Sequence, residues 1–372
     1  MQRLKITYIL SSIDKAIAFE WIAANIDKTK IDLSFILFNQ KEPYLYQWLK
    51  KNNIEVYYIS HFGKKSYPKT FFKTLSFLLK IKPNIVHTHL FDANLIGLSA
   101  AKLIGIKKRI FTRHHATYHH DNFPQAIKYD KWANAMATHV VAISKNVRNI
   151  LIEKESVSQN KISLIHHGFD LIQFQKVEQG EINKLKSKYN INDTDSPIVG
   201  VIARYIKWKG IQYIIPAFKR LLKNYPNAKL ILANATGPDK LYIQSILKQE
   251  LAKNQYLEIE FEANLFSLYR LFDVYVHVPI DKQIEAFGQT YVEALAAGVP
   301  SVFTLSGIAN EFIKDKENAL VVDYKNSDEI YNKLQLLLED EELRNQLIGN
   351  GRKSIEQFNL NLFIQKLEKL YE

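Results

Sequence analysis

Residues 285–300 read EAFGQTYVEALAAGVP, and they are the most informative stretch of the chain. The carboxylates of Glu285 and Glu293 are separated by seven residues. Small and apolar helix formers follow Glu293 until a glycine and a proline end the run, so Glu293 is predicted near the middle of a short helix. Gly288 lets backbone amides approach a ligand at the positive end of that helix. This arrangement suits a ligand that carries both hydroxyls and phosphate.

A second informative stretch, residues 199–210, reads VGVIARYIKWKG. Its apolar half predicts a strand, and the basic half predicts a phosphate-binding loop that leads into a helical pattern from Ile211 to Leu222. Taken alone, a surface Arg and Lys would explain the cations in this loop equally well. The two glutamates taken alone would more simply be solvated carboxylates, but the FG and EALAAGVP around them favour a ligand site.

The spacing of the two glutamates resembles the E-x7-E motif of the retaining group 1 glycosyltransferases, and residues 204–210 resemble the R-x4-K-G pattern of that family. The resemblance implies that Glu285 contacts the donor sugar and Glu293 the ribose, because ionised carboxylates accept two hydrogen bonds from a diol. It also places Phe287 and Gly288 at the donor. Arg204 and Lys209 would stabilise the departing diphosphate, with Lys207 as the alternative to Lys209.

The first half of the chain carries further matches to this family. Residues 82–89 (KPNIVHTH) resemble its first domain, and the segment FTRHHATYHHD, residues 111–121, follows a predicted strand. The family's T-x-H pattern implies that His114 approaches the donor sugar as a catalytic residue. His89 and Arg113 are expected on the acceptor side, where Arg113 would bind an acidic group.

The same segment contains four histidines and an aspartate, which could instead bind a metal ion. The family works without a metal, and adjacent histidines rarely both reach one ion. We therefore predict no metal and no cofactor.

The first predicted loop departs from the family pattern. Relatives normally have two or more glycines there, whereas residues 11–16 of this chain read SSIDKA, and the first glycine is Gly63. Ser11, Ser12 and Lys15 are expected to replace the missing amide contacts to the acceptor with hydroxyl and cation contacts.

Apolar runs alternate with helical patterns along the whole chain, which predicts two doubly wound α/β domains. The predicted strands are residues 6–10, 33–38, 56–59, 85–87, 109–112, 139–143, 162–165, 198–202, 229–233, 257–261, 274–278, 301–303 and 319–322. The polar segment 170–197 is the predicted junction, and its D-x-D at residues 193–195 is interpreted as loop.

The resemblance implies the GT-B fold, in which two Rossmann-like domains face each other across a cleft. We expect an acceptor-binding domain over residues 1–172 and a nucleotide-sugar-binding domain over residues 173–354. A C-terminal helix over residues 355–372 is expected to pack back on the first domain.

The net charge of +12 is concentrated in one half of the chain. Residues 1–190 contain 29 Lys and Arg against 14 Asp and Glu. Within them, residues 61–73 (HFGKKSYPKTFFK) interleave cations with aromatic residues. Such a segment suits an anionic membrane or an anionic acceptor. The alternatives are an ordinary Rossmann helix with a solvated lysine face and a general bias of composition towards lysine.

A chain of 372 residues is long enough for two domains, and the absence of cysteine excludes disulfides and thiol catalysis. No apolar run is long enough to span a membrane, and MQRLKITYIL enters a strand pattern rather than a signal peptide. We therefore expect a cytoplasmic protein, peripheral at the inner face of the membrane.

The resemblance implies a retaining glycosyltransferase that moves a sugar from a nucleoside diphosphate donor, UDP- or GDP-linked, to a hydroxyl of a glycan or glycolipid acceptor in cell-envelope synthesis. No nucleic-acid partner is expected. Two alternatives stay open: a nucleotide-sugar epimerase or glycan phosphorylase of similar architecture, and a non-catalytic polyanion-binding protein that would show salt-dependent binding without donor turnover.

Overall fold

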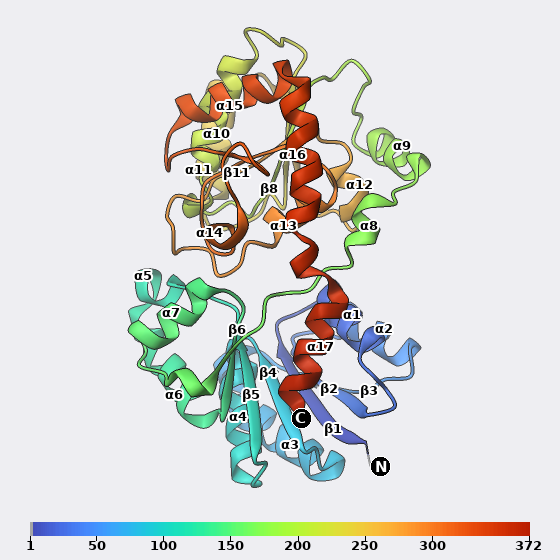
Figure 1. The fold of residues 1–372 in the computed structure, drawn as a ribbon. Helices are drawn as coiled ribbons and strands as arrows, with labels where there is room; N and C mark the ends of the chain where they lie inside the picture. The colour runs from blue at the N-terminus through green and yellow to red at the C-terminus, as the bar shows by residue number, and fades with distance from the viewer. Residues whose placement is uncertain (1–2) are drawn as a thin grey trace. The chain divides into compact units, whose positions relative to one another are not determined.

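The computed structural model describes residues 3–372, which form two α/β units (Figure 1). Unit 1 runs to Phe169 and takes in Leu360–Glu372, and unit 2 is Asp170–Asn359. No helix within residues 3–372 has both the length and the apolar surface that a membrane crossing requires. The assignment of acceptor binding to the first unit and donor binding to the second stays a prediction.

Unit 1 is built on a seven-stranded parallel sheet of order β3-β2-β1-β4-β5-β6-β7. Its first two strands are buried along most of their length, as expected for a sheet that helices cover on both faces. Ile6 of β1 pairs with Leu33 of β2 on one side and with Ile85 of β4 on the other. The strands are β1 (Leu4–Ser11), β2 (Ile31–Asn39), β3 (Glu55–Ser60), β4 (Ile85–His89), β5 (Lys108–Arg113), β6 (His139–Ala142) and β7 (Ile162–Leu164).

Most helices of unit 1 bury one face, whereas the short helix Tyr118–Asn122 buries no residue. Helix α3, for example, buries Thr70, Thr74, Leu78 and Ile81, which lie three or four residues apart on one side of the helix. The helices are α1 (Ile17–Asn25), α2 (Tyr44–Lys51), α3 (Tyr67–Ile81), α4 (Phe91–Leu103), α5 (Tyr118–Asn122), α6 (Ile127–Met136), α7 (Lys145–Glu153) and the C-terminal α17 (Leu360–Tyr371).

Helix α17 comes from the far end of the sequence and lies beside α1 (Figure 1). It begins at Leu360 rather than at the predicted residue 355, because residues 356–358 form a 3-10 turn. A Cβ atom on Gly168 would lie 2.4 Å from the Cβ of Phe363, so the close approach of α17 requires glycine there. At its end, the Tyr371 hydroxyl contacts the Tyr8 hydroxyl and lies 2.8 Å from Nδ1 of His87.

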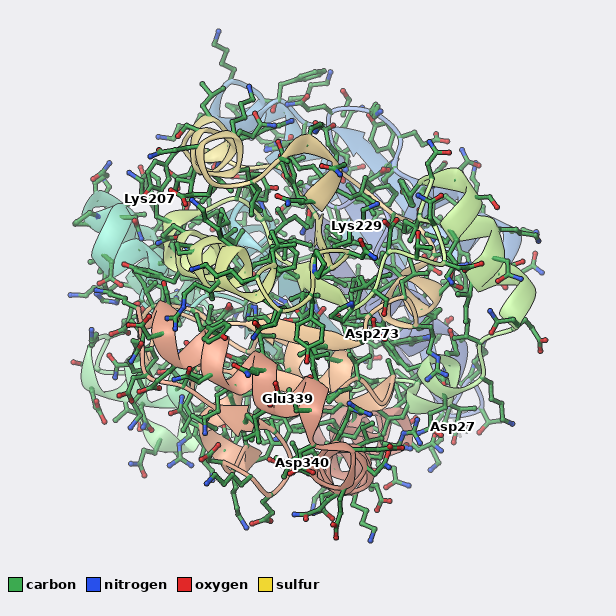
Figure 2. The ribbon with its side chains drawn as sticks, turned by 90° about the horizontal axis from the view of Figure 1, so that it is seen from above. Asp27, Lys207, Lys229, Asp273, Glu339 and Asp340 are labelled. Carbon is green, nitrogen blue, oxygen red and sulfur yellow. The ribbon has the colours of Figure 1, made fainter. Side chains whose placement is uncertain are left out.

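Unit 2 contains a six-stranded parallel sheet of order β10-β9-β8-β11-β12-β13. Asp273, labelled in Figure 2, fixes the start of β11 beside β8 by accepting a 2.6 Å hydrogen bond from the amide of Ile198. The strands are β8 (Ile198–Ile202), β9 (Lys229–Ala233), β10 (Tyr256–Ile259), β11 (Val274–His277), β12 (Ser301–Phe303) and β13 (Leu320–Val321).

The core of unit 2 is formed by the strands together with the apolar faces of α10, α11 and α15. Its helices are α8 (Leu171–Gln175), α9 (Gln179–Lys188), α10 (Ile211–Leu221), α11 (Lys240–Glu250), α12 (Leu265–Tyr269), α13 (Gln289–Ala296), α14 (Ala309–Phe312), α15 (Ser327–Glu339) and α16 (Glu341–Ser354). The predicted doubly wound α/β architecture is thus confirmed in both units. Residues 193–195 lie in the loop between α9 and β8, where Asp195 pairs with Lys229 at 2.5 Å.

Candidate active site

The basic loop of unit 2 leaves the carboxyl end of β8 and packs directly against the chain that leaves β11. The loop ends in a 3-10 turn, Lys207–Lys209, and then in Gly210 with a φ of +78°. A Cβ atom on Gly210 would lie 1.9 Å from the carbonyl oxygen of Val278. Only glycine tolerates both this φ and this contact, so Gly210 fixes the path of the loop. Lys209 is therefore held at the carboxyl edge of the sheet, where ligands of open α/β sheets bind.

Lys209, His277 and Glu285 form a compact cluster at this edge. Nζ of Lys209 donates to Oε1 of Glu285 at 2.5 Å, and Nε2 of His277 lies 3.1 Å from the same oxygen. The side chains of Glu285 and His277 are 7% and 1% exposed, so the contacts lie out of water. Nδ1 of His277 is buried and has no hydrogen-bond partner among residues 3–372.

The charge state of Glu285 follows from these neighbours. Burial by itself raises the pKa of a carboxyl group, but the Lys209 ammonium and the His277 hydrogen bond lower the pKa of Glu285 to about 2. Burial lowers the pKa of His277, so its imidazole is neutral at pH 7. The cluster therefore offers an ionised carboxylate that can only accept hydrogen bonds.

Gly288 marks the turn from Glu285 into α13. Its φ is +85°, and a Cβ atom there would lie 2.7 Å from the ring of Tyr291, so the turn requires glycine. The buried Phe287 packs edge-on against Phe358, and its carbonyl accepts a 2.9 Å hydrogen bond from the amide of Ile308. The residues after Glu285 are thus rigidly placed, and α13 starts with its amide end close to that carboxylate.

Glu293 lies in the middle of α13, where its side chain is buried against α12. The Tyr269 hydroxyl donates to Oε2 of Glu293 at 2.8 Å. Burial raises the pKa of Glu293 to about 7, although the Tyr269 hydrogen bond opposes that shift. The two glutamates of this region therefore differ: the neighbours of Glu285 favour its ionised form, and burial favours the protonated form of Glu293.

The other two cations of the basic loop are exposed. Within residues 3–372 the side chain of Arg204 makes no ion pair. Lys207, labelled in Figure 2, points its Nζ at the ring of Tyr242, 4.8 Å from the ring centroid. The geometry therefore separates Lys209, which contacts Glu285, from Lys207, which does not.

Unit 1 has its own cluster at the carboxyl ends of β4 and β5. Nδ1 of His89 lies 3.0 Å from Nε2 of His114, and the His114 ring stacks on His167 with 5.6 Å between centroids. Burial lowers the pKa of His89, His114 and His167, so all three are neutral at pH 7. Nε2 of His89 is buried and has no partner within the described chain. Because both rings are neutral, one ring nitrogen of the His89–His114 contact donates its proton and the other accepts it.

The loop after β1 presents its three predicted acceptor residues differently. Ser11 is buried, and its Oγ accepts a 3.3 Å hydrogen bond from the amide of Ala93, so it links β1 to the start of α4. Ser12 is exposed with a φ of +56°. Lys15 is also exposed, with Nζ 5.5 Å from the ring centroid of Tyr44.

Arg113 is engaged inside unit 1. It is 2% exposed, contacts Glu155, and places Nη1 3.2 Å from Oδ1 of Asp130. Its Nε donates to the carbonyl of His115 at 3.2 Å. The guanidinium of Arg113 is therefore paired inside unit 1, where it holds the histidine-rich segment 111–121 in place. This structure does not present it to an acidic group of an acceptor.

One group in the described chain has a geometry that can hold a metal ion: His115, His119 and Asp130, whose ligand atoms lie within 4.8 Å of one another. Nδ1 of His119 is 2.7 Å from Oδ2 of Asp130. The aspartate of this group is Asp130 of α6, and not Asp121 of the His-rich segment. The Arg113 guanidinium pairs with Asp130 and with Glu155, so it offsets part of the negative charge that would attract a cation there.

Sequence patterns did not identify His277, Tyr269 or Asp130 as members of these clusters. His277 could have been identified from the sequence, because it is the polar residue that ends the apolar strand β11. No sequence pattern could have identified Tyr269 or Asp130. Tyr269 reaches its partner only because α12 packs on α13, and Asp130 only because α6 packs on the histidine-rich segment 111–121.

Two family models match the chain. Residues 182–354 match the model described as "Glycosyl transferases group 1", and residues 22–173 match "Glycosyltransferase Family 4".

Relatives and solved structures agree with these matches. The chain is 28% identical to the capsular polysaccharide biosynthesis glycosyltransferase CapM of Staphylococcus aureus, over 87% of this chain and 91% of that protein. It is 24% identical to the alpha-monoglucosyldiacylglycerol synthase of Acholeplasma laidlawii, over 78% of this chain and 76% of that protein. The crystal structure of Anabaena HepE in complex with UDP-glucose superposes with a TM-score of 0.84 at 18% identity, covering 99% of each chain, which supports a shared fold.

Proposed function

This chain belongs to the group 1 glycosyltransferases and has their GT-B fold, and we propose that it transfers a sugar from a nucleoside diphosphate-sugar to an acceptor hydroxyl with retention of anomeric configuration. The observation that carries the proposal is the cluster of Lys209, Glu285 and His277 at the carboxyl edge of the unit 2 sheet. It places an ionised carboxylate and a cation side by side in a buried position.

Each residue of the site is assigned a different part of the donor. Glu285 accepts hydrogen bonds from the sugar hydroxyls, and the unpartnered Nδ1 of His277 is available to a further polar atom of the ligand. Lys209 and the exposed Arg204 face the diphosphate, whose charge grows as the bond to the sugar breaks. Glu293 receives the ribose hydroxyls. Phe287 and Gly288 hold the turn that keeps Glu285 and the amide end of α13 in register.

The reaction breaks the bond between the anomeric carbon and the diphosphate oxygen and forms a bond to the acceptor oxygen on the same face of the sugar. The acceptor proton passes to an oxygen of the leaving diphosphate, so no protein nucleophile is required. We assign His114 of unit 1 as a catalytic residue that acts as a neutral imidazole, with its Nε2 3.0 Å from Nδ1 of His89. Ser12 and Lys15 are the exposed groups of the acceptor loop.

The relatives support a choice of donor and acceptor class. Two relatives are named for capsular polysaccharide synthesis and for a glucosyldiacylglycerol product, and the HepE structure contains UDP-glucose. We therefore infer a UDP-sugar donor, with a GDP-sugar as the second candidate, and a glycan or glycolipid acceptor of the cell envelope. The reaction as written needs no metal, because Lys209 and Arg204 supply the positive charge. Neither the epimerase nor the polyanion-binding alternative draws support from the family matches.

A donor screen tests the proposal. Purified protein is incubated with UDP-, GDP-, ADP- and dTDP-sugars, and both the melting temperature and the slow release of nucleoside diphosphate are followed. We expect one nucleotide to stabilise the wild type and its sugar conjugate to be hydrolysed slowly. The Glu285→Gln and Glu293→Gln variants should lose turnover and stabilisation respectively, whereas Glu356→Gln, an exposed glutamate of the same unit, should behave as wild type.

The result that would overturn the proposal is a folded protein that no donor stabilises and that releases no diphosphate. Equal turnover in the Glu285→Gln variant would remove that residue from the donor site while leaving the transferase assignment intact.

A further inference from the structure

Helix α3 exposes large apolar side chains on its outer face. Phe72 and Leu79 are 67% and 54% exposed, and Phe62 in the turn before the helix is 61% exposed. Phe72 and Leu79 are seven residues apart, so they lie two turns apart on one side of the helix. Exposed apolar residues are common when they occur singly, but a row of them along one helix needs a further explanation.

The same face is strongly basic. Lys69, Lys73 and Lys80 are exposed and are spaced so that they line the stripe beside Phe72 and Leu79. Residues 56–91 contain six lysines and no aspartate or glutamate, so nothing in this segment neutralises them. An ordinary solvated helix face mixes both signs of charge and lacks exposed phenylalanine.

A shallow cavity of about 380 Å³ continues this face beyond the C-terminal end of α3. Leu79 and Ile104 give it apolar walls, and Lys82 and Lys107 are also part of its lining. Leu103, which precedes the lining residue Ile104 in the sequence, is 66% exposed. The apolar walls of the cavity suit the acyl chains of a lipid surface, and the lysines in its lining suit the anionic headgroups.

The N-terminal end of α3 is tied to the loop that the proposed function assigns to the acceptor. Asp92 at the start of α4 accepts hydrogen bonds from His61 at 3.1 Å and from Tyr67 of α3. The next residue, Ala93, donates its amide to Ser11 at the end of β1. The basic apolar face and the acceptor loop are thus joined through one rigid turn of unit 1.

We propose that the outer face of α3, defined by Phe62, Lys69, Phe72, Lys73 and Leu79, docks on an anionic lipid bilayer. This inference deepens the proposed function, because docking there presents a membrane-embedded glycolipid to the Ser11–Lys15 loop. The lysines meet the headgroups, and the phenylalanines and Leu79 enter the boundary of the acyl chains.

Vesicle flotation measures the docking directly, with vesicles of phosphatidylcholine alone and with added phosphatidylglycerol. We expect binding only to the anionic vesicles. Lys69→Glu/Lys73→Glu should weaken the binding roughly tenfold or more, since each lysine near such a surface contributes appreciably. Phe72→Ser/Leu79→Ser should weaken it comparably by removing apolar insertion.

Matched controls lie on unit 2: Lys223→Glu/Lys248→Glu makes the same charge change at exposed positions, and Leu241→Ser removes a side chain that is 84% exposed. Both controls should bind vesicles as wild type does. All variants should keep wild-type melting temperatures and wild-type release of diphosphate from the donor in water, which separates failure of docking from failure of the transferase assignment.

Two outcomes would overturn the docking proposal. One is a wild type that ignores anionic vesicles. The other is vesicle binding that the Phe72→Ser/Leu79→Ser variant retains in full while double-stranded DNA competes for the same lysines, which would identify a general polyanion surface instead.

Discussion

Nζ of Lys209 donates a 2.5 Å hydrogen bond to Oε1 of Glu285, joining the loop after β8 to the loop before α13. The two residues are 76 positions apart in the sequence, and both side chains are largely buried. This single contact brings the cation and the carboxylate of two separate sequence motifs to one place. The Lys209 ammonium in turn lowers the pKa of Glu285.

Replacing Lys209 by methionine should therefore damage both stability and turnover. Removing one partner of a buried pair leaves an uncompensated charge on Glu285, which costs about 3 kcal/mol of unfolding free energy. Turnover should fall roughly a hundredfold or more because the leaving diphosphate loses a cation. Urea denaturation and diphosphate release measure the two effects. Lys207→Met is the control, because Lys207 is exposed and should change stability by at most about 0.5 kcal/mol. Equal losses in both variants would contradict the assignment.

The raised pKa of Glu293 predicts a pH dependence of folding. The pKa is about 7 in the folded protein and 4.5 in the reference state. The folded state therefore holds a proton that the unfolded state releases, and the contribution to stability is full below pH 4.5 and lost as pH rises through 7. Over this window the free energy of unfolding should fall by on the order of 3 kcal/mol from this group.

Glu293→Gln should flatten that slope, as urea denaturation at a series of pH values would reveal. The variant keeps an oxygen that can accept the Tyr269 hydrogen bond, so its fold should survive. A wild-type profile and a Glu293→Gln profile that run parallel from pH 4.5 to 7 would show that Glu293 is ionised throughout.

Gly210→Ala should destabilise unit 2 by about 2 kcal/mol or more, because it combines a positive φ with a clash against a backbone carbonyl. Gly349 of α16 offers the matched control: no atom lies within 4 Å of a Cβ placed there, and its position is helical. Gly349→Ala should be neutral or stabilise by up to about 1 kcal/mol. Thermal unfolding distinguishes the two, and a silent Gly210→Ala would mean that the basic loop is not fixed by this contact.

The Tyr371 hydroxyl should contribute measurably to unit 1. Tyr371→Phe leaves the Tyr8 hydroxyl and Nδ1 of His87 without their shared partner in a fully buried position, which costs about 1–3 kcal/mol. Tyr331→Phe is the control, since its hydroxyl makes an exposed contact with Asn224. Donor stabilisation of the melting temperature should be the same in both variants. Equal melting temperatures would show that the hydroxyl network adds nothing.

Chelation tests whether a metal takes part. We expect prolonged EDTA treatment to leave donor turnover unchanged, because Lys209 and Arg204 supply the positive charge at the diphosphate. His115→Ala/His119→Ala, which removes two of the three candidate ligands, should not alter the metal content of the protein. One equivalent of zinc in the wild type that this variant lacks would contradict the expectation.

Most of the architecture could be predicted from local sequence patterns. Strand runs such as residues 198–202 and 229–233 agree with β8 and β9 because a strand buried on both faces must be apolar throughout. The ends of helices were predicted less accurately where a polar turn interrupts the apolar pattern. The helix that was predicted to begin at residue 355 begins at Leu360. Gly288 was predicted at the positive end of a short helix, and the structure places it at the N-cap of α13 with a φ of +85°.

The sequence by itself determined the residue types at the strand ends and the glycines that the loops require, because apolar periodicity and positive φ are properties of a few neighbouring residues. Tertiary structure alone decided the charges. It placed Lys209 and His277 beside Glu285 and so lowered the pKa of that carboxyl. It buried Glu293 against Tyr269, which raised the pKa of Glu293, and it enclosed Arg113 between Asp130 and Glu155. The physical reason is that ionisation depends on desolvation and on charges within a few ångströms, and such neighbours come from distant parts of the chain.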